Sequence, residues 1–104
     1  MVQHKLIRDK SVELKLHDPE KHTFEVTKGQ KYVSALQERI CDGAERYKMA
    51  NSDREAVEEL VDLLELIHTV LPLHNMTFEE LDMVRRRKKM EQGSFETGQV
   101  LLQN

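Results

Sequence analysis

The spacing of apolar residues restricts the fold of this chain more than any other feature of its sequence. Between residues 29 and 49 they recur three or four positions apart, at Val33, Leu36, Ile40, Ala44 and Tyr47. This spacing places the side chains on one face of an α-helix, so it predicts a helix near 29–49. A weak alternation over residues 22–27 predicts a short extended segment before that helix.

A second helix is predicted where a capping box begins. In this motif a Ser or Thr and a Glu three residues later bond to each other's backbone N–H groups. Ser52 and Glu55 fit the motif, and apolar residues then continue at helical spacing to Leu71, beside Pro72. Asp18 with Pro19 predicts a turn in the N-terminal part.

A third helix is predicted from a second capping box, formed by Thr77 and Glu80. It continues to about Gln92, where Gly93 supplies a stop. The predicted fold is therefore all-α: a helical bundle of three main helices with an irregular N-terminal segment.

The second predicted helix has too much apolar surface for a small protein to cover. At 100° per residue, its apolar positions take up more than half of the helix circumference. Three helices give a thin core, and small domains often add subunits to bury the remainder. We therefore expect a single domain over residues 1–104, completed by oligomerisation as a homodimer or a larger homo-oligomer.

Composition indicates a protein that does not enter a membrane. Charged residues make up 34% of the 104 positions, and no apolar run approaches the ~20 residues that a membrane span needs. No apolar signal region follows the first residues, so a cytoplasmic location is expected. The lone Cys41, which we expect to be buried, excludes an internal disulfide.

The charge balance disfavours a general nucleic-acid binder. The formal net charge is -3 and the isoelectric point is about 5.9. One local exception is the run of five cations from Arg85 to Lys89. This basic block leaves open a helical protein that binds a nucleic acid or a partner through diffuse charge.

Four acids form two pairs on consecutive predicted helices. Asp42 and Glu45 are spaced i,i+3, and so are Glu59 and Asp62. Each pair shares one helix face, and a short linker makes antiparallel packing of the two helices the expected arrangement. Four carboxylates in one small volume repel each other without a cation, and Mg²⁺ prefers oxygen ligands. The pairs therefore predict a metal-dependent enzyme that acts on phosphates.

The alternative is that these acids lie on solvated outer faces, which is usual for runs of charge. An exposed helix often places a Lys or Arg four residues after an acid. No such residue follows Glu45, Glu59 or Asp62, which favours the metal site over the alternative.

The acid pairs resemble the metal signature of the all-α nucleoside triphosphate pyrophosphohydrolase superfamily. That superfamily includes MazG-like proteins and phosphoribosyl-ATP pyrophosphohydrolases. The run KLIRDK at residues 5–10 is similar to the opening motif of a small single-domain subfamily of proteins that are like the latter. Residues 58–65 resemble its second acidic helix and residues 89–95 its closing segment, so the resemblance spans nearly the whole chain.

The resemblance implies a hydrolase that cleaves nucleoside triphosphates between the α and β phosphates, giving a monophosphate and pyrophosphate. It implies that Mg²⁺, with Mn²⁺ as a substitute, is held by Asp42, Glu45, Glu59 and Asp62. Glu38 or Glu58, which adjoin these ligands, would orient the attacking water. The phosphates would be bound by Arg8, Lys10 and Lys89, and Phe95 would stack on the base. The alternatives are surface charges for the three cations and packing of the tail for Phe95.

Two departures from the subfamily keep a second function open. Gly43 and Arg46 stand where the subfamily has further acids, so only the Asp42 and Glu45 register remains on the first helix. The alternative function is a degenerate, non-catalytic module of the same fold that binds nucleotide or mediates dimerisation.

Overall fold

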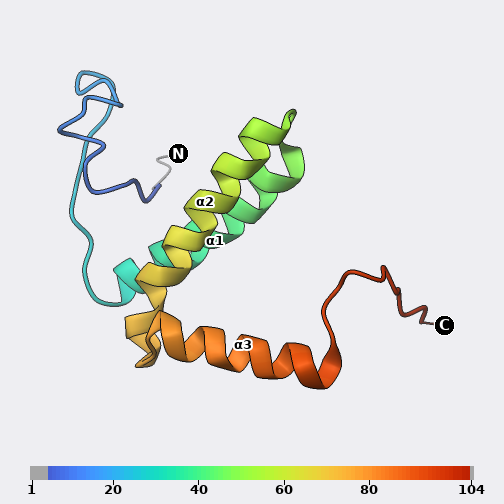
Figure 1. Cartoon of the computed structure of the whole chain (residues 1–104). Coiled ribbons are helices and arrows are strands. Elements are labelled where there is room, and N and C mark those ends of the chain that lie inside the picture. Colours follow the sequence, from blue (N-terminus) through green and yellow to red (C-terminus); the bar gives the residue numbers. More distant parts are fainter. Residues whose placement is uncertain (1–4, 104) are drawn as a thin grey trace. The chain divides into compact units, whose positions relative to one another are not determined.

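The computed structural model describes residues 5–103, and this part of the chain is all-α. Its elements are α1 (Gln30–Met49), α2 (Asp53–Val70), the 3-10 helix η1 (Leu71–His74) and α3 (Phe78–Gln92) (Figure 1). The predicted all-α class is confirmed. The prediction of an extended segment at 22–27 is wrong, because these residues form a loop. The described residues contain no second strand with which such a segment could pair.

The chain divides into two compact units, Met1–Val70 and Leu71–Asn104. The first contains the N-terminal segment, α1 and α2, and the second contains η1, α3 and the C-terminal tail. The single domain, the three-helix bundle and the oligomer expected from the sequence stay predictions.

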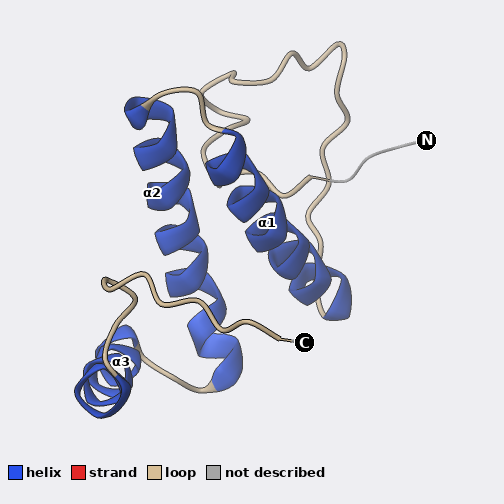
Figure 2. Cartoon of the chain, turned by 90° about the vertical axis from the view of Figure 1, so that its right-hand side faces the viewer, coloured by secondary structure: helices blue, strands red, loops and turns tan. Residues whose placement is uncertain are grey.

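In the first unit, α1 and α2 lie side by side and run antiparallel (Figures 1 and 2). Helix α1 matches the predicted range and begins after Gly29, whose φ of 62° is one that favours glycine. The two helices meet closely at Gly43, where an added Cβ would lie 2.9 Å from Cδ2 of Leu63. Gly43 therefore has a packing role in this hairpin.

The start of α2 differs in one detail from the predicted capping box. The Ser52 hydroxyl accepts a hydrogen bond from the backbone N–H of Glu55 at 3.2 Å, as predicted. The carboxylate of Glu55, however, accepts from the N–H of Asn51 at 3.0 Å. The capping box predicts that Glu55 accepts from the N–H of Ser52, one residue later. The motif therefore located the helix start correctly and predicted one of its two hydrogen bonds.

Few apolar side chains of the described residues are buried. Only Leu36 and Leu71 are, at 1% and 7% exposure. An apolar stripe on α2 stays exposed and consists of Val57, Leu60, Val61 and Leu64. Cys41 is exposed as well, so its expected burial is wrong. It lies about 140° around α1 from Leu36, away from the face that meets α2.

The N-terminal segment, residues 5–29, contains one helical turn. It is closed by bonds from the N–H of Lys15 to the carbonyl of Val12 and from the N–H of Leu16 to the carbonyl of Ser11, both 3.0 Å. Lys15 has a φ of 55°, the left-handed conformation of this helix-ending motif. The turn predicted at Asp18 is confirmed, because its carboxylate accepts from the N–H of Glu20 at 2.9 Å.

In the second unit, α3 has the complete capping box that the sequence predicts. The Thr77 hydroxyl accepts from the N–H of Glu80, and the Glu80 carboxylate accepts from the N–H of Thr77, each at 3.1 Å. Gly93, with a φ of 81°, ends the helix as predicted. None of the helices in the described residues is long and apolar enough to cross a membrane.

The basic block on α3 is partly neutralised by a neighbouring acid. Asp82 accepts a hydrogen bond from Nε of Arg85 at 2.8 Å, and its other oxygen lies 3.2 Å from Nε of Arg86. The hydrogen bond from Arg85 lowers the pKa of Asp82. Two of the five cations are thus engaged within the helix, which weakens the case for a nucleic-acid surface.

Candidate functional site

One acid from each helix of the hairpin faces the same arginine. Arg39, on α1, places Nη1 3.9 Å from Oδ2 of Asp42 and Nη2 3.7 Å from Oδ2 of Asp62 on α2. The Arg39 side chain is only 13% exposed. The antiparallel packing predicted from the short linker therefore brings Asp42 and Asp62 to opposite sides of one buried guanidinium.

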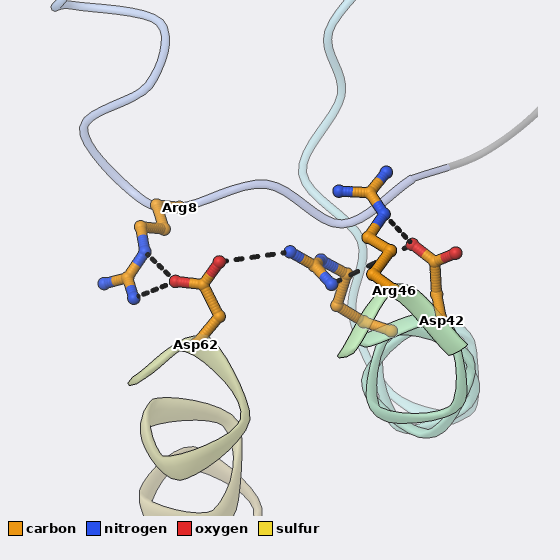
Figure 3. A network of polar contacts seen from close by, with 5 residues as sticks. Arg8, Asp42, Arg46 and Asp62 are labelled. Carbon is orange, nitrogen blue, oxygen red and sulfur yellow. Dashed lines mark hydrogen bonds and ion pairs between the residues drawn. The ribbon is translucent and has the colours of Figure 1, made fainter. Parts of the chain in front are cut away.

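Each of these two acids also contacts a second arginine (Figure 3). Arg8, in the N-terminal segment, donates from Nε at 3.2 Å and from Nη2 to the same oxygen of Asp62, Oδ1. Arg46, on α1, places Nε 3.2 Å from Oδ2 of Asp42. The order is Arg8, Asp62, Arg39, Asp42, Arg46, which we call the charge row.

The pairing with Asp62 also affects Arg8 itself. Its hydrogen bond to this carboxylate raises the pKa of Arg8 above the value usual for arginine. Arg8 is therefore a permanent cation at one end of the charge row.

Glu59 and Lys5 lie next to the charge row. One oxygen of Glu59, Oε2, is buried and has no hydrogen-bond partner among the described residues. Burial lowers the pKa of Lys5, and Arg46 and Arg39 lower it further, whereas Asp42 and Glu59 act in the opposite direction. The Lys5 ammonium thus lies in the field of both helices, near the predicted metal ligands.

A cavity of about 510 Å³ opens between the N-terminal segment and the hairpin. Apolar side chains that include Leu6, Leu14, Leu36 and Leu66 line it, together with the ring of Tyr32. Its polar lining includes Arg8, Lys10, Arg39 and Asp62. The volume suits a small organic ligand, and the charge row forms part of the cavity wall.

The other predicted residues of the first unit lie elsewhere. Glu38, Glu45 and Glu58 are exposed, as the solvated-face alternative expects. Glu58 lies 3.5 Å from Nε of Arg54, one turn earlier on α2. The structure thus brings Arg8, Lys10, Asp42, Glu59 and Asp62 to one region of the hairpin, and it leaves Glu38, Glu45 and Glu58 outside the charge row.

Lys89 and Phe95 belong to the second unit. Both are exposed, and Phe95 is exposed completely. Their predicted contacts with phosphate and base stay predictions.

The donor chemistry of the hairpin suits a hard divalent cation. Asp42 and Asp62 lie on facing helices, and the buried oxygen of Glu59 has no hydrogen bond in the described part of the chain. Carboxylate oxygens of this kind are the ligands that Mg²⁺ prefers. Within residues 5–103, however, no three His, Cys, Asp or Glu side chains are grouped so that they could hold a metal ion. Arginine nitrogens contact the aspartate oxygens instead, and the metal site stays a prediction.

Three cations of this site were missed in the sequence, namely Lys5, Arg39 and Arg46. A signal for two of them is readable: Arg39 precedes Asp42 by three residues and Arg46 follows it by four. Both spacings place a cation beside an acid on one helix face. Asp42 therefore differs from the three acids that have no cation four residues later.

Comparisons of this chain with models of known protein families, with curated proteins and with solved structures find no match.

Proposed function

We propose that this protein is a Mg²⁺-dependent nucleoside triphosphate pyrophosphohydrolase that cleaves between the α and β phosphates. The observation that carries the proposal is the approach of Asp42 and Asp62 from two antiparallel helices. Close by in sequence on α2, the buried Oε2 of Glu59 has no hydrogen-bond partner among the described residues. The motifs in residues 5–10, 58–65 and 89–95 support it through their resemblance to the pyrophosphohydrolase superfamily.

Each group of the site has a role in this proposal. Asp42, Glu59 and Asp62 would hold the cation, and Glu45 would join them after its side chain turns inward. The cation would supply charge neutralisation of the triphosphate and polarisation of the reacting phosphorus. Arg8 and Lys10 would bind phosphate oxygens at the mouth of the cavity, which would take the nucleoside.

The remaining predicted residues complete the proposal. Glu38 or Glu58 would orient the water, Lys89 would bind phosphate and Phe95 would stack on the base, as the resemblance implies. The protein would work as a homodimer or a larger homo-oligomer, which the exposed apolar stripe on α2 supports.

A second function is favoured by the position of Arg39. A guanidinium between Asp42 and Asp62 neutralises both acids without a metal, at 3.9 and 3.7 Å. A protein that uses Arg39 in this way would be the degenerate, non-catalytic module that binds nucleotide or mediates dimerisation. The two functions differ in whether divalent cations are needed.

The test is pyrophosphate release from a panel of standard and modified nucleoside triphosphates, with Mg²⁺, with Mn²⁺ and with a chelator. Asp62→Asn and Glu59→Gln proteins run alongside, with Glu79→Gln on the exposed face of α3 as a matched control. We expect metal-dependent release that both site variants lower by more than the roughly 10- to 100-fold typical of outer-shell changes. Glu79→Gln should retain the wild-type rate.

Absence of release from every substrate by a folded protein would contradict the hydrolase. Nucleotide binding that persists in chelator and is weakened by Arg39→Gln would then support the non-catalytic module.

A further inference from the structure

Arg8 and Asp62, which are hydrogen-bonded to each other, both line the cavity. Arg8 belongs to the N-terminal segment, which supplies Leu6, Ile7, Lys10, Ser11 and Leu14 to the cavity wall. Between the described parts of this segment and the two helices, the side-chain hydrogen bonds both run from Arg8 to Asp62. The segment is otherwise bonded within itself, through the turn that ends at Leu16.

The Asp62 carboxylate has two uses that compete with each other, contact with arginine and the proposed binding of a cation. Both donors of Arg8 bond to Oδ1 of Asp62, and Oδ2 lies 3.7 Å from Arg39. A cation bound to either oxygen would lie close to a guanidinium, so the positive charges would repel each other while both arginines stay in place. Arg39 is held within the hairpin at 13% exposure, whereas Arg8 is 56% exposed and is the partner free to leave.

We propose that Arg8 is a latch: it holds the N-terminal segment over the cavity by occupying Asp62, and release of that carboxylate to a divalent cation frees the segment and opens the cavity. This inference rests on the proposed function, since it takes Asp62 as a metal ligand. The latch adds an order of events to that function: the cation binds Asp62, Arg8 is released, and the cavity opens. The freed guanidinium is then available to a phosphate of the incoming nucleotide.

The size of the effect follows from the exposure of the pair. Ion pairs at exposed sites contribute about 0.2–1 kcal/mol, which corresponds to about 1.4- to 5-fold in an equilibrium constant. Loss of Arg8 should therefore tighten the binding of a bare cation by about 1.4- to 5-fold.

The first measurement is the affinity for Mn²⁺ without nucleotide, by titration calorimetry, in wild-type protein and in Arg8→Gln. The control is Arg85→Gln on α3, which breaks an Arg–Asp pair of almost the same exposure: 59% and 32%, against 56% and 31% for Arg8 and Asp62. We expect tighter binding in Arg8→Gln, an intermediate value in Arg8→Lys, and no change in Arg85→Gln. Equal or weaker binding by Arg8→Gln would overturn the latch.

The second measurement is the rate of cleavage after Lys10 and Lys15 by a protease specific for lysine, whose sites are the same in wild-type protein and in Arg8→Gln. Arg8→Gln should be cleaved faster than wild-type protein without metal. Saturating Mn²⁺ should raise the wild-type rate toward that of the variant, with the helix content by circular dichroism unchanged. Metal binding without faster cleavage would also overturn the latch.

Failure of the latch and failure of the hydrolase give different results. If the protein releases pyrophosphate but neither the Mn²⁺ affinity nor the cleavage rate changes as expected, the latch is overturned and the hydrolase is supported. Tighter Mn²⁺ binding by Arg8→Gln without release from any nucleotide supports the latch and overturns the hydrolase. Absence of Mn²⁺ binding by both proteins overturns the latch, and the hydrolase is then judged by pyrophosphate release alone.

Discussion

At the residue scale, Gly43 has a structural explanation that the sequence did not indicate. Glycine inside a helix costs about 1 kcal/mol relative to alanine. The close approach of Leu63 accounts for it, since a Cβ at position 43 would lie 2.9 Å from Cδ2 and 3.3 Å from Cγ of that side chain. The absence of a side chain at this position is therefore tied to how closely α1 and α2 pack.

Replacement of Gly43 by valine tests this explanation. We expect Gly43→Val to lower the free energy of unfolding by about 1–3 kcal/mol, because the added methyl groups force the helices apart. Ala44→Val, at the exposed neighbouring position, introduces the same side chain and should cost only a few tenths of a kcal/mol, or about the helix-propensity difference. Urea denaturation measures both. Equal losses in the two variants would mean that contact with Leu63 is unimportant.

At the element scale, the sequence located the helices well because their signals are local. The apolar spacing placed α1 within one residue of its start, and two capping motifs placed the starts of α2 and α3. The N-terminal segment was harder to predict, because its helical turn is closed by Lys15 in a left-handed conformation where glycine is the usual signal.

The capping box of α3 allows a prediction about that helix. Thr77→Ala removes the hydroxyl that accepts from the N–H of Glu80, and we expect it to destabilise α3 by about 1 kcal/mol. Amide hydrogen exchange in the first turn of α3 reports the change directly. Glu80→Gln keeps an acceptor for the N–H of Thr77, so its exchange rates should stay close to wild type. Unchanged protection in Thr77→Ala would contradict the prediction, and loss of protection in Glu80→Gln would show that the charge of Glu80 contributes as well.

At the scale of the whole molecule, the apolar stripe on α2 is a helix face that the described part of the chain leaves exposed. Val57, Leu60, Val61 and Leu64 follow helical spacing and stay exposed. Few apolar side chains are buried elsewhere in the described chain, so a core of this size gives limited stability to a monomer. We expect two copies to pack together through this stripe.

A charge placed in the stripe tests that association. Leu64→Glu should shift the protein from dimer to monomer in sedimentation velocity, because a carboxylate would be buried between the subunits. Met90→Glu, on the exposed surface of α3, introduces the same charge outside the stripe and should leave the dimer intact. A wild-type monomer at all concentrations would show that the stripe does not join two copies.

The candidate site was predictable only in part, because spacing along a chain fixes which backbones meet and does not fix which side chains pair. The i,i+3 spacing and the short linker were enough to bring Asp42 and Asp62 together. The same rules cannot tell that Arg8, 54 residues away from Asp62 in sequence, bonds to it. Long flexible cations reach their partners through the tertiary fold, so Lys5 and Arg8 are visible as neighbours of the acids only in three dimensions.

The charge row alternates in sign and holds three arginines against two aspartates. A bare cation would be repelled by the arginines of the charge row, and a bare triphosphate would be repelled by its aspartates. A cation already joined to a triphosphate carries both signs, so each arginine can exchange a carboxylate for a phosphate oxygen while the aspartates turn to the cation. On the proposed function, metal and nucleotide would each bind weakly alone and strengthen one another by the same factor, as thermodynamic linkage requires.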